Sequence, residues 1–425
     1  YEAERSFIAD ETNYPANTFI IPLAQPYRAF IKDLMERKAY PMMTTREGTP
    51  DLPYDEASWT LPLQMGVKAI QVTNPFQAEM KQLSKIDRPQ TKFAGKGSNY
   101  FFLLNQANND SILLNRLHKK GVKIHFSEKS FDHEGKIFPA GTIILDGGQV
   151  TQPALSALAK DLGLNIFQSK TKPEAKLFPL LQPKIGLYQS WIANSDEGWL
   201  RWVLEQFEFP FNSIHNEEIK AGNLENSYTH IILPSMSTST LIEGRKEGET
   251  PPQYAGGIGQ EGISSFENFV HKGGKLICIG NSSDFAIQYL GLALKNLVSF
   301  PSPRERTADS STEKERKERI YCPGSLLKVE INDSLPAGFG MGKEGTIFSY
   351  FSPVFAVEKG TVIASYPLYN PLLSGIILNE DKLLGKAAAI ECSSGAGKVI
   401  LLGFNVLHRA QAHGSFKFLF NSLLF

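Results

Sequence analysis

A cysteine and a histidine in the second half of the chain are residue types that nucleophilic attack on an amide requires. In GGKLICIGNSS (273–283), Cys278 lies in an apolar run that Gly280 ends. Such a break is typical of a strand turning into a helix. There a histidine such as His408 can take the proton of a cysteine thiol, and the resulting thiolate can attack a carbonyl carbon. The competing interpretation is that Cys278 is a small apolar core residue, as free cysteines commonly are.

Around these two residues the sequence resembles class I glutamine amidotransferases. That family ends a strand in Cys-x-Gly, and its closing motif, which carries the base histidine, is similar to GFNVLHRAQAHGSFKFLFN (403–421). Two features depart from the family pattern, because Ala410 stands where the orienting acid belongs and Ile277 stands where a glycine usually precedes the cysteine. We therefore assign no catalytic residue and keep a cysteine-dependent amidotransferase or amidohydrolase, using Cys278 and His408, as an alternative.

A second candidate is the H-x-x-E spacing of HNEE (215–218), with which a zinc carboxypeptidase site begins. A third ligand is needed, but His230 is too near and His271 falls on a predicted helix. A loop or helix start with acids near its N-terminus explains His215 and Glu218 equally well. We predict no metal site in this chain.

Two glycine-rich stretches are also better explained by local structure. The G-x-G-x-x-G pattern of Gly257, Gly259 and Gly262 follows the loop-like KEGETPPQYA, whereas a dinucleotide fingerprint follows a strand. We predict a loop that enters a helix. SSGAGKV (393–399) lacks the first glycine and the final Ser or Thr of a phosphate loop and is predicted to be a hairpin turn. No cofactor is predicted for this chain.

Polar residues after the predicted strands suggest a cleft. In a doubly wound sheet, ligands bind beyond the carboxyl ends of the strands. The candidate lining residues are Gln189, Ser190, Trp191, Ser235, Asn281, Arg409 and His413. Polar groups beside an indole suit a small sugar or peptide ligand, and the alternative is that they bind one another and water. Trp199 and Trp202, three residues apart, are predicted to face a core.

Residues 1–175 are predicted to form a smaller α/β domain. TFIIPLAQPYRAFIKDLMERKAYP (18–41) predicts a strand over Phe19–Leu23 and a helix with Phe30, Leu34 and Met35 on one face. A similar strand–Gln–helix plan recurs in residues 99–126 and suggests a weak internal duplication. The Lys- and Pro-bearing stretch SKTKPEAKLFPLLQPK is predicted to be the linker.

Residues 181–425 are predicted to form a class I glutamine amidotransferase-like domain. The apolar runs KIGLYQSW, FPFNSIH, THIILPS and KLICIG alternate with helical patterns, of which SDEGWLRWVLEQF has Ser195 as expected N-cap. This alternation predicts the α/β class, with a doubly wound, mostly parallel, flavodoxin-like sheet. An insertion is expected at about 296–355, including the charged, solvated segment 304–319.

Composition limits the classes of function. The 425 residues are 42% hydrophobic and 21% charged, with net charge +0, so no global field would attract nucleic acid or an anionic membrane. Three cysteines do not make a disulfide framework, and no apolar run has the length of a membrane span. Because the chain starts at Tyr1, we interpret it as part of a longer polypeptide whose export signal would lie upstream.

Longer stretches are more distinctive than these motifs. Five of them resemble the C-terminal region of large bacterial zinc carboxypeptidases of the carboxypeptidase A-like family: PYDEASWTLPLQMGV (53–67), PKIGLYQSWIANSDEGWLRWVLEQFEFPF (183–211), YAGGIGQEGISSFENFVHKGGKL (254–276), YCPGSLLKVEI (321–331) and HRAQAHGSFKFLFNSLL (408–424). The resemblance implies a preceding peptidase domain that holds the zinc ion and the general-base glutamate. No residue of this chain matches those ligands.

These observations predict a non-catalytic accessory region of a zinc metallocarboxypeptidase-like protein. The expected roles are docking of its own N-terminal peptidase domain, control of substrate access, or homo-oligomerisation. The resemblance also implies peptide hydrolysis by the parent protein and a secreted or periplasmic location. A sugar- or peptide-binding module and the cysteine enzyme remain as alternatives.

Overall fold

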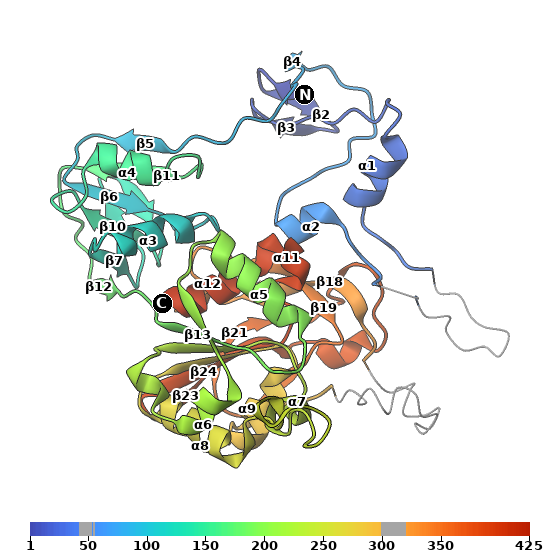
Figure 1. The fold of residues 1–425 in the computed structure, drawn as a ribbon. Coiled ribbons are helices and arrows are strands. Elements are labelled where there is room, and N and C mark those ends of the chain that lie inside the picture. The colour runs from blue at the N-terminus through green and yellow to red at the C-terminus, as the bar shows by residue number, and fades with distance from the viewer. Residues whose placement is uncertain (42–52, 54–55, 299–319) are drawn as a thin grey trace.

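The computed structural model describes residues 1–41, 53, 56–298 and 320–425 (Figure 1). The charged segment predicted to be solvated, 304–319, lies outside these residues. Among the helices described, none combines the length and the apolar composition that crossing a bilayer demands.

Residues 1–41, 53 and 56–91 form an N-terminal arm with little regular structure. Its short strands stand at the top of Figure 1, whereas residues 61–65 lie against the larger sheet. Its elements are β1 (Glu2–Ala3), β2 (Phe7–Ala9), β3 (Thr12–Tyr14), α1 (Arg28–Met35), α2 (Leu61–Met65) and β4 (Met80–Lys81). The predicted strand Phe19–Leu23 is wrong: only Phe19 forms an isolated bridge, with Glu2. Pro22 has no N–H to donate to a ladder, and the predicted duplication loses its first strand with it.

A six-stranded sheet follows, in the order β12-β7-β10-β6-β11-β5. Its strands are β5 (Lys92–Gly95), β6 (Tyr100–Leu103), β7 (Ile124–Ser127), β10 (Ile143–Asp146), β11 (Asn165–Ser169) and β12 (Leu177–Leu180). All neighbours are antiparallel except β5 and β11. The helices α3 (Asp110–Lys119) and α4 (Gln152–Leu158) and the hairpin of β8 (Phe131–His133) and β9 (Lys136–Phe138) complete this region.

The strand β12 lies within the segment predicted to be a linker. Leu177–Leu180 pairs with β7 and lies at the edge of the six-stranded sheet, although it contains Pro179. An edge strand tolerates proline because one side of the strand needs no ladder donors. The passage between the two large sheets is therefore shorter than predicted, since β13 starts at Ile185.

The second large sheet has 12 strands and a parallel half. The parallel strands run in the order β14 (Phe211–Ile214), β13 (Ile185–Tyr188), β15 (His230–Leu233), β16 (Lys275–Ile279) and β24 (Gly397–Leu402). The antiparallel continuation contains β17 (Leu294–Asn296), β18 (Pro323–Ile331), β19 (Glu344–Tyr350), β20 (Phe355–Val357), β21 (Thr361–Ser365), β22 (Leu372–Ser374) and β23 (Ala387–Ser394). β18 and β19, which fall in the predicted insertion, are thus strands of the same sheet.

Helices cover both faces of the parallel strands. Leu204 of α5 (Ser195–Gln206) and Phe418 of α12 (Phe416–Leu424) pack with Ile232 and Ile277 on one face. Helices α6 (Asn216–Ala221), α8 (Gly259–His271) and α9 (Ser282–Tyr289) pack on the other face, with Leu276 and Cys278. This arrangement, together with the smaller α/β region before it, confirms the predicted α/β class with a largely parallel, doubly wound sheet.

Helix α5 differs from the sequence prediction in its N-cap and in the exposure of its tryptophans. Its N-cap is Asn194, not Ser195, because the Asn194 side chain accepts hydrogen bonds from the first-turn amides. The tryptophans of this helix do not face a core: Trp199 is 38% and Trp202 45% exposed. The core-facing stripe is Leu200, Val203 and Leu204, which places both indoles on its borders.

A buried lysine links the two large sheets. Lys417 at the start of α12 donates a hydrogen bond to Asn105 Oδ1 after β6, over 3.0 Å. Burial lowers the pKa of Lys417 to about 8, and burial raises the pKa of Asp110, at the start of α3, to about 6. The attraction between these two charges opposes both shifts. A buried polar contact therefore joins α12 to the residue that follows β6, with the Asp110 charge of α3 close by.

Candidate functional site

Cys278 lies in the interior of the sheet. It stands in β16 between Leu233 of β15 and Leu401 of β24, and 0% of its surface is exposed. Burial raises the pKa of its thiol far above the ordinary range, so a thiolate does not form at neutral pH. The structure supports the core interpretation of this cysteine.

His408 is engaged elsewhere. Its ring stacks on Phe348 of β19 with centroids 3.5 Å apart, and Nε2 lies 3.3 Å from Glu56 Oε2. His408 packs against β19 and the N-terminal arm, whereas the Cys278 side chain is enclosed between β15 and β24 with no exposed surface. The two residues of the alternative cysteine enzyme are therefore not brought together as nucleophile and base.

The HNEE residues contact different partners. The His215 ring lies 2.8 Å from the Gln189 carbonyl oxygen through Nδ1, and Glu218 accepts a hydrogen bond from Tyr228 Oη over 2.7 Å. His215 precedes α6 as its N-cap residue and Glu218 lies in the first turn, so the predicted helix start with early acids is confirmed. Among the described residues, no group of three histidine, cysteine or acidic side chains is arranged to hold a metal ion.

The glycine pattern serves helix packing. A 3-10 turn at Pro252–Tyr254 precedes it and α8 begins at Gly259, as predicted for a loop that enters a helix. A Cβ on Gly257 would lie 2.5 Å from the Leu241 and Ile242 carbonyl oxygens, and one on Gly262 would lie 2.4 Å from Ile258. The glycines allow α8 to approach its neighbours, and the second glycine-rich stretch is the turn between β23 and β24, also as predicted.

At the carboxyl ends of β13 and β14, three predicted residues and two further rings lie together. Trp191 stacks on His215 with centroids 4.1 Å apart and planes 3° from parallel, and Tyr254 meets the indole edge-on at 4.8 Å. Gln189 accepts a hydrogen bond from Arg201 through Oε1, and Ser190 Oγ accepts from the Ile192 amide. The indole Nε1 of Trp191 is buried and has no hydrogen-bond partner in the part of the chain that the structure describes.

Beyond β15 and β16, Ser235 and Asn281 also meet. Ser235 Oγ accepts a hydrogen bond from the Asn281 amide over 3.3 Å, and the Ser235 carbonyl accepts from Asn194 Nδ2 over 3.0 Å. Gly280 adopts φ of 53°, and a Cβ there would lie 2.6 Å from Ser235 Oγ. These residues are joined to the start of α5 through Asn194, on the same edge as Trp191.

Arg409 and His413 contact other groups. Arg409 Nη2 lies 3.3 Å from Glu56 Oε1, and the His413 ring stacks on Phe416 at 4.6 Å while its carbonyl accepts from Asn108. Residues 408–410 all have φ between 25° and 59°, a left-handed run that aims this segment at the N-terminal arm. Gln189, Ser190, Trp191, Ser235 and Asn281 thus share one edge, and Arg409 and His413 bind other neighbours.

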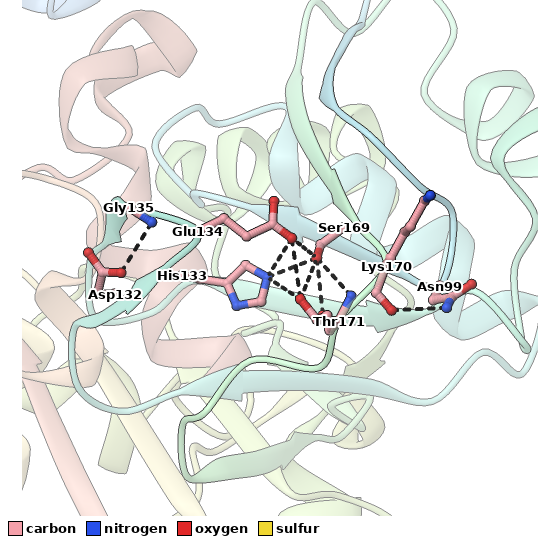
Figure 2. Close-up of polar contacts among 8 residues, drawn as sticks. All are labelled: Asn99, Asp132, His133, Glu134, Gly135, Ser169, Lys170 and Thr171. Atoms are coloured by element: carbon pink, nitrogen blue, oxygen red, sulfur yellow. Dashed lines mark hydrogen bonds and ion pairs between the residues drawn. The ribbon is translucent and has the colours of Figure 1, made fainter.

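A polar cluster in the six-stranded region contains no residue among the predicted site residues. It consists of His133, Glu134, Ser169 and Thr171, and we call it the hairpin latch (Figure 2). Ser169 Oγ, at the end of β11, lies 2.9 Å from His133 Nε2 and donates to Glu134 Oε1 over 2.6 Å. The Thr171 amide donates to the same hydroxyl over 3.0 Å. The Ser169 hydrogen bond holds the pKa of Glu134 below its usual range.

The hairpin latch has the residue types of a serine hydrolase but not the geometry. In a Ser-His-acid triad the acid binds the ring nitrogen that the serine does not use. Here Glu134 Oε1 binds the serine hydroxyl itself and lies 3.6 Å from the same His133 Nε2. The cluster closes on itself and fastens the β8–β9 turn to the end of β11. His133 and Ser169 are 36 residues apart, and no local motif announces their pairing.

Comparisons with known proteins address the fold only. No protein-family model and no curated protein matches the chain. Among solved structures, a glutamine amidotransferase from Thermotoga maritima is 10% identical with a TM-score of 0.32 over 55% of this chain and 80% of its own. A beta-galactosidase from Bacillus circulans is 11% identical with a TM-score of 0.30 over 56% of this chain and 31% of its own.

An exo-beta-1,4-mannosidase from an Opitutaceae bacterium is 11% identical with a TM-score of 0.33 over 57% of this chain and 36% of its own. The chain therefore spans about a third of the length of these two glycosidases. None of the three proteins is a carboxypeptidase. At these scores the likenesses carry no functional argument, and the fold stands on the strand order and helix layers given above.

Proposed function

We propose that this chain is a non-catalytic accessory region of a longer zinc metallocarboxypeptidase-like polypeptide and that it docks the peptidase domain. The single observation that carries the non-catalytic part is the separation of Cys278 from His408. Cys278 is sealed in β16, and His408 is stacked on Phe348 beside Glu56. The parent activity and its zinc ion enter from the sequence resemblance alone.

The N-terminal arm supports the docking part. Helix α1 has no buried residue, and its Phe30 side chain is 62% exposed. Ile21 and Tyr27, just before this helix, are exposed as well. Adjacent exposed apolar side chains on a poorly packed segment are typical of a surface that a partner covers. In contrast, the described residues on either side of position 50 are fastened to the large sheet, since the Lys38 amide, Ser58 and Thr60 all bond to Ser374 Oγ.

Two measurements test the proposal separately. Purified chain incubated with glutamine should release no ammonia above the level of Cys278→Ala. Ammonia release that Cys278→Ala abolishes would favour the cysteine amidohydrolase instead. For docking, the coding sequence upstream should encode a peptidase domain with H-x-x-E and a distant histidine, and this domain, produced separately, should bind the chain.

A pair of variants makes the docking test specific. Phe30→Asp should weaken binding to the peptidase domain at least about tenfold, because it places a charge in the apolar contact. Ile137→Asp is the matched control, since Ile137 of β9 is 74% exposed but lies in the six-stranded region. Equal binding by both variants would place docking elsewhere, and no binding by the unmodified chain would refute it.

A second candidate function is the binding of a small ligand at the Trp191 edge. The observation that favours it is the buried indole Nε1 without a partner, beside the flat stack with His215. An aromatic face with an unused donor suits a sugar or peptide ligand. A screen of glutamine, peptides and simple sugars should give a melting-temperature shift that Trp191→Phe removes. If no compound in the screen shifts the melting temperature, the accessory role remains as the single proposed function.

A further inference from the structure

The amino ends of three parallel strands align three basic residues in one row. His230 of β15 is the register partner of Lys275 in β16, and Lys275 is the register partner of Lys398 in β24. Directly paired residues of neighbouring strands project from the same face of a sheet. This amino edge is the opposite end of the parallel strands from the Trp191 edge, so the row is separate from the candidate site described above.

Among the residues that the structure describes, only Lys398 of this row forms a salt bridge, although Glu391 also attracts the Lys275 charge. Lys398 Nζ lies 2.7 Å from Glu391 Oε1 of β23. His230 is 8% exposed, and its Nε2 has no hydrogen-bond partner among the described residues. Lys275 is half-buried and, within the described part of the chain, has no ion pair or side-chain hydrogen bond. An unpaired polar atom this deep in a sheet calls for a partner, because burial without a hydrogen bond is costly.

The neighbours of His230 determine which ring nitrogen carries its proton. Thr229 Oγ1 accepts a hydrogen bond from the Lys184 amide over 2.9 Å and lies 2.8 Å from His230 Nδ1. Its single hydroxyl proton goes to Nδ1, because the competing Lys184 carbonyl is 3.4 Å away. Nδ1 is then the acceptor, and Nε2 carries the proton and is an unused donor.

The charges of the row are asymmetric. Burial and the nearby Lys398 lower the pKa of Lys275 to about 8, which leaves this amine protonated at neutral pH. Burial and the Lys275 charge lower the pKa of His230 to about 3, which leaves the ring neutral. Two ammonium groups thus face a single carboxylate, that of Glu391. The two unpaired groups are both donors, and the group missing between them is a negatively charged acceptor.

We propose that the amino edge of the parallel sheet binds a small oxyanion, whose oxygens accept hydrogen bonds from Lys275 Nζ and His230 Nε2. Lys398 and Glu391 form the outer wall of this site and set its net charge. The shared chemistry of the ligand is a compact oxygen-bearing anion, either inorganic phosphate or the carboxylate of a larger molecule. Binding would supply both missing contacts at once and offset the repulsion between Lys275 and Lys398.

The test uses the whole chain and three probes. The melting temperature is followed during titration with sodium phosphate, and in separate arms with sodium acetate, with sodium chloride at matched ionic strength as reference. A specific site stabilises the folded chain with the logarithm of ligand concentration above Kd. We expect phosphate, acetate or both to raise the melting temperature beyond chloride. A response to phosphate alone identifies a phosphate-type ligand, and a response to acetate identifies a carboxylate.

Variants separate the site from general salt effects. Lys275→Met and His230→Phe should each weaken the anion response at least about tenfold, because each removes one of the two donors. Lys272→Met is the matched control, since Lys272 loses the same charge but pairs with Glu225 on the surface. It should retain the full response. No response beyond chloride in the unmodified chain, or an undiminished response in Lys275→Met and His230→Phe, would overturn the proposal.

Discussion

The hairpin latch and the two ends of the parallel strands treat their buried polar groups differently. In the six-stranded region, Ser169, His133 and Glu134 bind one another within 2.6 to 3.6 Å. In the parallel half of the twelve-stranded sheet, Trp191 Nε1 and His230 Nε2 have no hydrogen-bond partner within the described ranges. These two atoms lie at opposite ends of neighbouring strands, one beyond the carboxyl end of β13 and the other at the amino end of β15.

This difference separates structural polar groups from candidate ligand-binding ones. A closed cluster such as the hairpin latch needs nothing from outside, and its hydrogen bonds stabilise the fold. An unpaired buried donor costs free energy unless something else supplies the acceptor. The hairpin latch is therefore best described as a structural cluster, and ligand chemistry is expected at the two ends of the parallel strands. Elsewhere in the six-stranded sheet, Ser127 Oγ and Gln168 Oε1 are also buried without a hydrogen-bond partner among the described residues.

The largest expected effect comes from breaking the hairpin latch. Ser169→Ala removes the hydroxyl that joins His133, Glu134 and the Thr171 amide, and should lower the free energy of unfolding by about 2 kcal/mol. Urea denaturation measures this change. Ser156→Ala, on the exposed face of α4, is the control and should stay within about 0.5 kcal/mol of the unmodified chain. If Ser169→Ala leaves the free energy of unfolding unchanged, the hairpin latch does not stabilise the fold and the contrast with the unpaired donors fails.

A substitution in the row at the amino edge should change the free energy of unfolding in the opposite direction. Lys275→Met removes an unpaired, half-buried charge, and without added phosphate or acetate it should raise the free energy of unfolding by about 1 kcal/mol at pH 7. The pKa of Lys275 is lowered from 10.5 to about 8 in the folded chain. The contribution of its neutral amine is therefore fully present above pH 10.5 and lost as the pH falls through 8.

The pH dependence of stability tests the direction of this effect. The advantage of Lys275→Met over the unmodified chain should shrink as the pH rises from 7 to 10, which urea denaturation at each pH measures. A constant difference across this range would mean that Lys275 is not desolvated. A destabilised Lys275→Met at pH 7 would mean that the amine already has a partner.

The last prediction concerns the residues of the Trp191 edge whose polar groups are hydrogen-bonded. Asn194→Ala removes the cap of α5 and the contact with the Ser235 carbonyl, and should cost about 1 kcal/mol. Ser195→Ala, at the position that the sequence suggested as the cap, should cost almost nothing. Thermal unfolding of both variants distinguishes the two assignments, and the reverse order would restore Ser195 as the cap.

Local patterns predicted the parallel core because each buried strand is a short apolar run bounded by polar or glycine residues. KIGLY, HIILP and KLICIG became β13, β15 and β16 with boundaries close to those expected. The same approach failed for Phe19–Leu23, where Pro22 argues against the predicted strand, and for β12, where proline led to the prediction of a linker. Whether an apolar run becomes a strand depends on a neighbouring strand, which the run itself does not encode.

The candidate sites depend on the same long-range information. Grouping residues after strands correctly joined Ser235 to Asn281. It did not foresee that the left-handed segment 408–410 turns Arg409 towards Glu56. The row of His230, Lys275 and Lys398 had a signal, because each is a basic residue at or next to the start of an apolar run. Only the strand order shows that the three are neighbours.

The most direct test of the non-catalytic assignment is the reactivity of the cysteines in the folded chain. Cys278, Cys322 and Cys392 are all buried, and the pKa of each thiol is raised by burial. With a thiol reagent and peptide mass analysis, we expect Cys278 to be modified only as fast as the chain unfolds. Rapid modification of Cys278 in the native chain, faster than that of Cys322 and Cys392, would reveal an accessible thiolate and contradict the account.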